Sequence, residues 1–160
     1  MKRGHRAPLF NSALETGVRS ALILDAARPR AFDLAHLTWL DHLVVHTTDI
    51  GGPPSLHPDI PQRDGELLVR RRNVEAGLLL MRRLHLIAAH YSEAGISYSA
   101  TDEAGLFVQL VRSPYGKVLK ARADWLVAYV ASDDSGALIQ LVTEKIGRWS
   151  IEFQTEGQTG

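Results

Sequence analysis

The sequence contains no cysteine, and this absence excludes several classes of chemistry. Disulfide frameworks, thiol nucleophiles, thiolate-bound zinc and iron–sulfur clusters all need cysteine side chains. No apolar run approaches the roughly 18 residues that a membrane span requires. The basic residues 1–6 are not followed by the apolar core of a signal peptide. We therefore expect a cytoplasmic protein with no membrane partner.

An excess of charge of one sign is missing as well. The 160 residues carry 18 Lys and Arg against 18 Asp and Glu, and the sequence pI is about 7.1. A neutral total argues against a protein that coats nucleic acid by bulk charge, although it leaves room for a local basic patch. The hydrophobic fraction of 45% and the charged fraction of 22% are ordinary for globular proteins. We predict one folded domain with a sizeable core.

Helix signals account for most of the chain. Ser12 and Glu15 have capping-box spacing, and the apolar helix that they begin runs until Arg28-Pro29. Asp33 caps a second, largely apolar helix that ends near Thr47. Further helices are predicted at residues 73–85, 101–113, 114–131 and 137–147. Trp149, Ile151 and Phe153 alternate as in a short strand or an extended docking tail.

Residues 48–65 are the least helix-like part of the sequence. They contain prolines at 53, 54, 58 and 61 and glycines at 51, 52 and 65. Proline fixes φ and restricts the residue before it, so these prolines stiffen the segment. Its apolar residues, Ile50, Leu56 and Ile60, favour a packed, ordered loop. Residues 66–69, directly after it, are either a short strand or the lead-in to the third helix.

Two short segments, 86–92 and 96–101, flank a turn that contains Gly95, which predicts a β-hairpin. The order helix, helix, long loop, helix, hairpin, helix is that of a winged helix-turn-helix. The expected fold class is therefore mainly α (α+β), with a winged helix-turn-helix core, one β-hairpin wing and a C-terminal helical extension. The expected divisions are an N-terminal arm (1–10), the winged-helix domain (11–131, with the proline-rich loop 48–65 and the wing 86–101), a C-terminal helix and docking tail (132–153) and a disordered tail (154–160).

Arginines gather around the third predicted helix. Between residues 63 and 85, six arginines stand against three acidic residues. This local excess makes five of them candidate nucleic-acid contacts: Arg70, Arg71, Arg72, Arg82 and Arg83. The outward stripe of the helix also carries Ala76 and Leu79, and the hairpin tip carries Glu93, which would repel phosphate. We favour an apolar protein-binding surface rimmed by arginine over DNA, with an ordinary solvated face as the remaining interpretation.

Two other patterns have the residue types of catalytic or metal sites. His42 and His46 stand at i,i+4 on one helix, which is a metal-ligand spacing, but buried or half-buried packing histidines are the favoured interpretation. Ser55, His57 and Asp59 are the residue types of a hydrolase triad, yet residues this close more naturally bond to their own loop backbone. The sequence also has no glycine-rich phosphate loop. We therefore expect no catalytic residue, metal or cofactor.

Several short strings together carry a resemblance to a known family. They are Pro8-Leu9-Phe10-Asn11-Ser12 with Glu15 and Arg19, Leu40-Asp41, Val45-His46, Asp49-Ile50-Gly51-Gly52-Pro53-Pro54-Ser55-Leu56-His57-Pro58, Gly65-Glu66-Leu67-Leu68-Val69-Arg70-Arg71, Gly77-Leu78, Ser113-Pro114-Tyr115 and Arg122-Ala123-Asp124-Trp125. With these strings the chain resembles, from about residue 8 to 130, the small middle component (type 2) of bacterial ABC-three-component systems. It is also similar to the small subunit of Lamassu-type defence systems.

The resemblance implies a non-catalytic accessory subunit of a bacterial complex that acts against phage or plasmids. Its implied partners are an ABC ATPase of the SMC or Rad50 type and an effector protein of the same system. Whether the arginines also contact double-stranded DNA within the complex stays open at this point. The motif residues then suggest a pre-shaped protein-docking surface, to which the outward stripe adds Leu79: Asp49, Gly52, Pro53, Ser55, His57, Pro58, Glu66 and Leu79. The alternative is a winged-helix DNA-binding transcriptional regulator that uses the arginines of the third helix.

Overall fold

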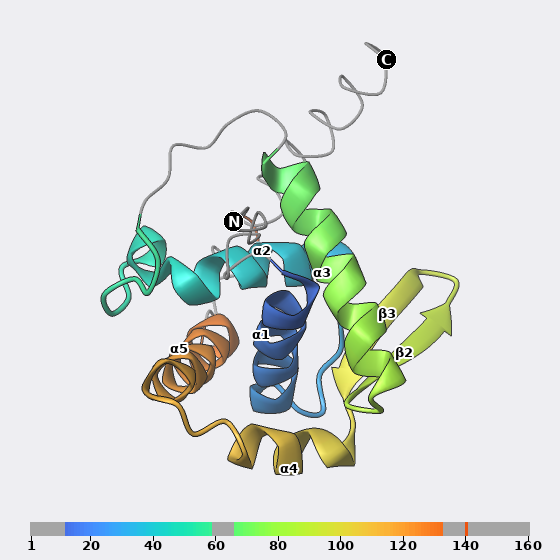
Figure 1. Ribbon diagram of the computed structural model, residues 1–160. Coiled ribbons are helices and arrows are strands. Elements are labelled where there is room, and N and C mark those ends of the chain that lie inside the picture. The colour runs from blue at the N-terminus through green and yellow to red at the C-terminus, as the bar shows by residue number, and fades with distance from the viewer. Residues whose placement is uncertain (1–11, 59–65, 133–139, 141–160) are drawn as a thin grey trace, which may run out of the picture.

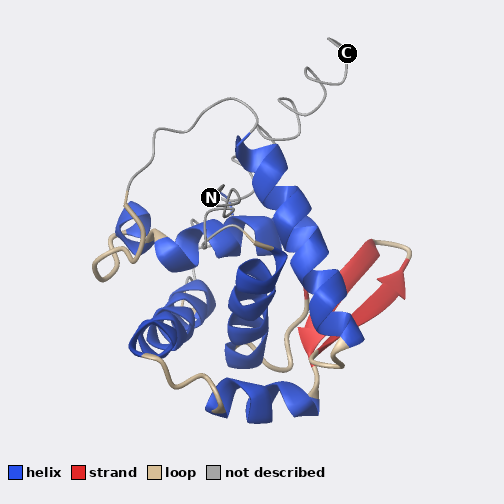
Figure 2. Ribbon diagram, viewed as in Figure 1, coloured by secondary structure: helices blue, strands red, loops and turns tan. Residues whose placement is uncertain are grey.

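The protein is mostly helical with a small antiparallel sheet, an α+β fold. The computed structural model describes residues 12–58, 66–132 and 140. In this part of the chain the elements are α1 (Ala13–Ala26), β1 (Phe32–Asp33), α2 (Leu34–Val45), the 3-10 turn η1 (Thr47–Ile50), α3 (Glu66–Arg83), β2 (Ile87–Ser92), β3 (Gly95–Ala100), α4 (Asp102–Gln109) and α5 (Pro114–Ala131). Helix α1 stands in the middle of the other helices, and the hairpin projects beside the C-terminal end of α3 (Figures 1 and 2).

Side-chain caps begin three of the helices where the sequence predicts them. The Ser12 side chain accepts a hydrogen bond from the Glu15 N–H (3.1 Å), and Asp33 accepts one from the His36 N–H (2.8 Å). Ser113 accepts one from the Gly116 N–H (3.0 Å), directly before the proline that opens α5. Each cap satisfies a backbone donor that a helix leaves unbonded in its first turn. The predicted starts of α1, α2 and α5 are confirmed.

Helix α3 is longer than predicted at its N-terminal end. It begins at Glu66, so residues 66–69 are helical lead-in and the alternative of a short strand is wrong. The predicted end at residue 85 is two residues too late, because the helix ends at Arg83, and the Leu84 side chain beyond it is 52% exposed. His85 follows with a φ of 60°, which redirects the chain into β2.

Close contact between α1 and α3 holds the centre of the fold together. A Cβ on Gly77 would lie 2.6 Å from the Gly17 backbone nitrogen, so only glycine allows the two backbones to pack this tightly. One apolar core lies on the side of α1 that packs against α2, α4 and α5. A second core joins α1 and α2 to α3 and the sheet. The fold therefore fixes α3 against the interior along one face and leaves its other face at the surface.

The predicted hairpin is confirmed, and it forms part of a three-stranded sheet in the order β1-β3-β2. Strands β2 and β3 pair without interruption from Ile87 opposite Ala100 to Ser92 opposite Gly95. Gly95, with a φ of 118°, provides the turn conformation. The two-residue strand β1 pairs with β3 through Phe32 opposite Tyr98, and no sequence pattern indicated this strand.

Several predictions lie wholly or mostly outside the described residues. They are the arm 1–10, the part of the proline-rich loop at 59–65, and the C-terminal segments 132–153 and 154–160. Within the described part of the chain, no helix combines the length and apolar character needed to cross a membrane.

Candidate protein-docking surface

A buried ion-pair cluster connects the three helices α1, α2 and α3. Arg19 of α1 and Asp41 of α2 are 2% and 1% exposed, and the Arg19 Nε donates to Asp41 Oδ1 over 2.7 Å. Arg19 Nη2 lies 3.3 Å from Asp41 Oδ2, the same oxygen that accepts from Arg70 Nη1 of α3 at 2.5 Å. The two guanidiniums share one carboxylate, which gives it short charge-assisted bonds in a dry setting. This cluster fixes the first half of α3 relative to α1 and α2.

A row of aromatic and imidazole rings runs from α2 through the loop to α5. The centroid of His42 lies 5.4 Å from that of Trp39 and 4.5 Å from that of His46, and His46 meets His57 edge-on at 6.1 Å. His57 in turn stacks on Tyr115 at 6.2 Å. The row bridges the loop to two helices that are far apart in the sequence.

Two histidines of this row, His42 and His57, are held neutral. Burial lowers the pKa of His42 to about 4, although its Nε2 lies 2.9 Å from Asp49 Oδ2. Burial and the charge of Arg19 lower the pKa of His57 to about 4, and its Nε2 lies 2.8 Å from the Tyr115 hydroxyl. Burial also raises the pKa of Tyr115. At pH 7 these rings therefore pack and hydrogen-bond without carrying charge.

His42, in α2, and His46, directly after its last residue, are both buried, in agreement with the favoured interpretation as packing histidines. Across the described residues, no group of three or more His, Asp or Glu side chains is placed to hold a metal ion. Ser55 Oγ contacts the Thr48 N–H and hydroxyl, whereas His57 bonds to Tyr115, so the two side chains have different partners. Asp59 lies outside the described residues.

The described part of the proline-rich loop, residues 48–58, is ordered by its own backbone, as predicted. The Thr47 hydroxyl donates to the Pro53 carbonyl (2.6 Å), and the Gly52 N–H donates to the Thr47 carbonyl (2.9 Å). The N–H groups of Leu56 and His57 both donate to the Val45 carbonyl at the end of α2. These bonds fold the loop back onto the helix from which it emerges.

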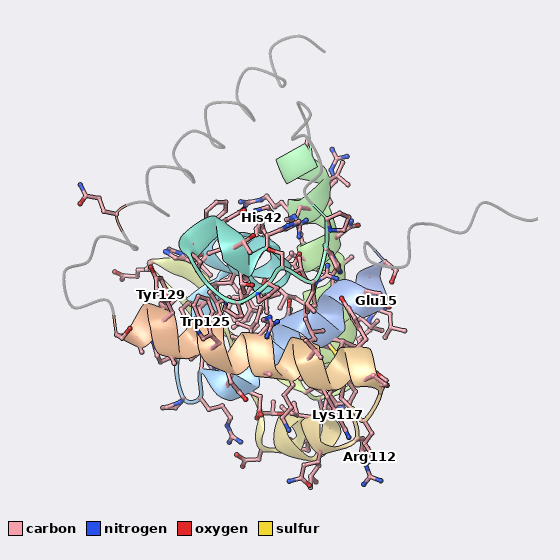
Figure 3. The ribbon with its side chains drawn as sticks, turned by 90° about the vertical axis from the view of Figure 1, so that its left-hand side faces the viewer. Glu15, His42, Arg112, Lys117, Trp125 and Tyr129 are labelled. Carbon is pink, nitrogen blue, oxygen red and sulfur yellow. The ribbon has the colours of Figure 1, made fainter. Side chains whose placement is uncertain are left out.

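Helix α5 holds the other side of this loop. Arg122 donates through Nε and Nη2 to the Pro54 carbonyl at 3.2 and 3.1 Å. Gly52 sits against Trp125, so that a Cβ there would lie 2.4 Å from Trp125 Cη2. Trp125 stacks on Tyr129 with centroids 5.2 Å apart, and Figure 3 shows both on the C-terminal half of α5. The loop thus presents a fixed shape.

The predicted docking residues of the loop differ in how far they are exposed. Asp49 and Pro58 are exposed, although the Asp49 carboxylate contacts His42. The others in the loop are partly buried and shape it from within: Gly52, Pro53, Ser55 and His57. The side chain of Glu66 lies outside the described residues.

The predicted outward stripe of α3 is confirmed, and it separates the five candidate arginines. Arg72, Ala76, Leu79 and Arg83 are all exposed. Arg70 belongs to the buried cluster, and Arg71 is half-buried. Arg82 is half-buried beside the hairpin, where its Nη2 donates to the Tyr91 hydroxyl at 3.2 Å. The cationic part of this face therefore lies at its two ends, with small and apolar side chains between them.

An open groove of about 590 Å³ continues this face toward the hairpin. It lies between the C-terminal end of α3, strand β2 and the start of α4, with Leu79 on its apolar side. Its lining residues are Leu79, Arg82, Arg83, His85, Ile87, Ala88, Ala89, Thr101 and Glu103. No sequence pattern predicted this groove, because it is formed by segments that only the fold brings together.

The comparison with known families decides where the chain belongs. The family model of the ABC-three component (ABC-3C) system Middle Component 2 matches residues 9–152. The chain belongs to this family. No curated protein and no solved structure matches it. As a Middle Component 2 protein it is one part of a multi-component system, which implies partner proteins and suggests an accessory role.

The contacts among the Middle Component 2 motif residues were not predicted from the sequence. Arg19, Asp41, Tyr115, Arg122 and Trp125 occur in the motif strings, but the structure shows that they hold the loop and α3 in place. A signal was present for two of them. Asp41 is the only acidic residue in the apolar helix α2, and Arg19 lies within the apolar run of α1. One charge of each sign inside apolar helices is typical of a buried pair.

Proposed function

We propose that this protein is a non-catalytic adaptor that joins an SMC- or Rad50-like ABC ATPase to an effector protein in a bacterial, cytoplasmic complex that acts against phage or plasmids. In this role it is similar to the small subunit of Lamassu-type systems. Family membership supports the existence of partners. The observation that carries the adaptor role is the proline loop, whose polar groups are engaged by Thr47, Val45 and Arg122 in holding one shape.

A loop held in this way is suited to protein recognition. A surface that is ordered before binding loses little conformational entropy when a partner docks. The loop keeps Asp49, Pro54 and Pro58 exposed, whereas Gly52, Pro53, Ser55 and His57 are partly buried. The neutral, buried state of His42 and the engagement of His57 by Tyr115 support a packing role for these side chains, and with it a non-catalytic subunit.

We further propose that the core is a winged helix-turn-helix. The element order α1, β1, α2, α3, β2, β3 supports this assignment, as does the pairing of the short β1 with β3 on the outside of the hairpin. Helix α3 then takes the place of the recognition helix, and the hairpin takes the place of the wing. In the adaptor, this face contacts protein through Leu79, which is 47% exposed between the arginines.

Affinity purification of the full chain, tagged in its native host, tests the adaptor role. We expect a large ABC ATPase and a second protein to co-purify and to be identified by mass spectrometry. Leu79→Asp on α3 should release a partner, whereas Leu106→Asp, at a more exposed position on α4, is the matched control and should release none. Recovery of the chain alone, or only as a homodimer, would contradict the proposal.

The second candidate function is that of a DNA-binding regulator, which the exposed Arg72 and Arg83 on α3 favour. A salt titration of duplex binding by the isolated chain distinguishes the two functions. Direct DNA binding predicts a steep loss of affinity with salt, and Arg72→Ala should reduce the log–log slope by about 0.9. Arg112→Ala, exposed between α4 and α5, is the control substitution. The adaptor predicts weak duplex affinity that neither variant changes.

A further inference from the structure

Strand β2 lies at an open edge of the sheet. In the order β1-β3-β2, strand β3 is paired on both sides, and β2 has a neighbouring strand on one side only. The hydrogen bond from the Thr101 N–H to the Leu86 carbonyl marks these opposite residues as a hydrogen-bonded pair. By alternation, Ala88, His90 and Ser92 direct their backbone groups toward β3. The backbone N–H and C=O groups of Ala89 and Tyr91 therefore point away from the sheet.

Within the described part of the chain, this edge lacks several of the protections that edge strands usually carry. Apart from the pairing of β2 with β3, the described residues provide no backbone hydrogen-bond partner for Ala89 or Tyr91. The strand contains no proline or lysine, and its one-to-one register with β3 has no bulge. Natural proteins blunt or cover edge strands, because a bare edge pairs with other chains. Because this protein is one component of a larger system, the bare edge of β2 indicates that another component covers it in the assembly.

The groove beside this edge identifies the chemistry of its occupant. It is lined by Ala88 and Ala89 of β2 and by Leu79, Arg82 and Arg83 of α3. The small alanine side chains leave room for a neighbouring strand, and Leu79 offers an apolar contact. The two guanidiniums favour acidic side chains at the C-terminal end of α3.

We infer that an extended acidic segment of a partner protein adds to the free edge of β2 as a fourth strand and lies in the groove against α3. This inference rests on the proposed adaptor function and specifies where and how one partner docks. Strand addition uses the outward donors and acceptors of Ala89 and Tyr91, and the groove supplies sequence preference. A duplex is a poorer occupant, because phosphate oxygens cannot donate hydrogen bonds to the outward carbonyls of Ala89 and Tyr91.

Residue-resolved hydrogen exchange on the purified complex tests this pairing directly. We expect the amides of Ala89 and Tyr91 to exchange at least about fivefold more slowly in the complex than in the free chain. This slowing corresponds to about one net hydrogen bond for each amide. The amides of His90 and Ser92, which already bond to β3, should change much less. Burial under a protein that does not add a strand would slow neighbouring amides without this alternation, and would overturn the inference.

Two substitutions at the same position isolate the backbone donor. Tyr91→Pro and Tyr91→Val both remove the ring and its contact with Arg82, but only proline removes the outward N–H. We expect Tyr91→Pro to lower partner recovery about fivefold relative to Tyr91→Val, with equal thermal stability of the two isolated variants. Arg83→Glu should also lower recovery, and Arg112→Glu, outside the groove, should not.

The outcomes separate this inference from the proposed function. If the ATPase and effector co-purify equally well with Tyr91→Pro and Tyr91→Val, strand addition is wrong and the adaptor stands. If no partner co-purifies with the unmodified chain, both fail. Slowing of the Ala89 and Tyr91 amides in a homodimer, or only after a 20-base-pair duplex is added, would overturn the inference by identifying a different occupant.

Discussion

Removing the carboxylate that Arg19 and Arg70 share is the most informative perturbation of the fold. Asp41→Asn keeps the size of the side chain but removes the charge that two guanidiniums contact at 2.7 and 2.5 Å. Arg19 is 2% exposed, so water cannot readily replace the lost carboxylate. Breaking a buried pair by removing one partner costs about 3–5 kcal/mol, because the other charge stays buried.

This cost is large compared with the total stability of a domain. Domains have unfolding free energies of about 5–15 kcal/mol. For a chain of this length, 1 kcal/mol corresponds to roughly 2–4 °C in Tm, so Asp41→Asn should lower Tm by about 6–20 °C. Urea denaturation of both proteins at pH 7, followed by tryptophan fluorescence, measures the free energy difference directly.

Two controls show whether the loss arises from the buried pair. Asp102→Asn disrupts the ion pair between Asp102 and Arg28, which are both exposed, and should lower the free energy of unfolding by less than about 1 kcal/mol. In a double-mutant cycle, Arg19→Met and Asp41→Asn should be non-additive by at least about 1.5 kcal/mol. A loss below about 1 kcal/mol for Asp41→Asn, or additive effects in the cycle, would refute the role of this pair.

Three further predictions concern close packing and pH. Gly77→Ala forces α1 and α3 apart and should lower the free energy of unfolding in urea by about 2 kcal/mol. Gly105→Ala is the control: its new Cβ has no neighbour closer than 3.9 Å, so this variant should be slightly more stable. Equal effects of the two substitutions would contradict the close helix contact. Gly52→Ala should displace Trp125, change tryptophan emission and cost about 1–3 kcal/mol; an unchanged spectrum and stability would contradict this contact. The folded pKa of His42 is about 4 and the unfolded value is 6.5, so the unfolded chain binds the proton first as pH falls. His42 alone should therefore lower the free energy of unfolding by about 2 kcal/mol from pH 7 to pH 5, and His57 should add to this fall. His42→Gln should reduce that fall, and an unchanged pH profile would contradict the neutral, buried state of this ring.

Local signals predict most of the helices, because their evidence is contained in a few neighbouring residues. Ser12, Asp33 and Ser113 bond to backbone N–H groups three residues ahead, so a cap can be predicted without tertiary information. The outward stripe of α3 follows from helical periodicity in the same way. The start of α3 at Glu66 has no such local signal. The second turn of this helix is held in place by the hydrogen bond from Arg70 to Asp41, which is distant in the sequence.

The parts that could not be predicted depend on contacts between distant segments. Strand β1 has two residues, too few for an alternating pattern, and exists through its pairing with β3. The proline content predicts a stiff loop, but not that Arg122 and Trp125 hold it from α5. The groove needs α3, β2 and α4 together. The sequence groups Arg70 with four other arginines, and only the fold separates its guanidinium, which contacts the buried Asp41, from the exposed stripe.

The proposed adaptor physically connects an ATPase to an effector, and recovery of the effector with a tagged ATPase, in the native host with and without this chain, tests that connection. We expect the effector to be lost from the purified material when the chain is deleted and to return when the chain is restored. Equal recovery of the effector in the absence of the chain would contradict the adaptor role.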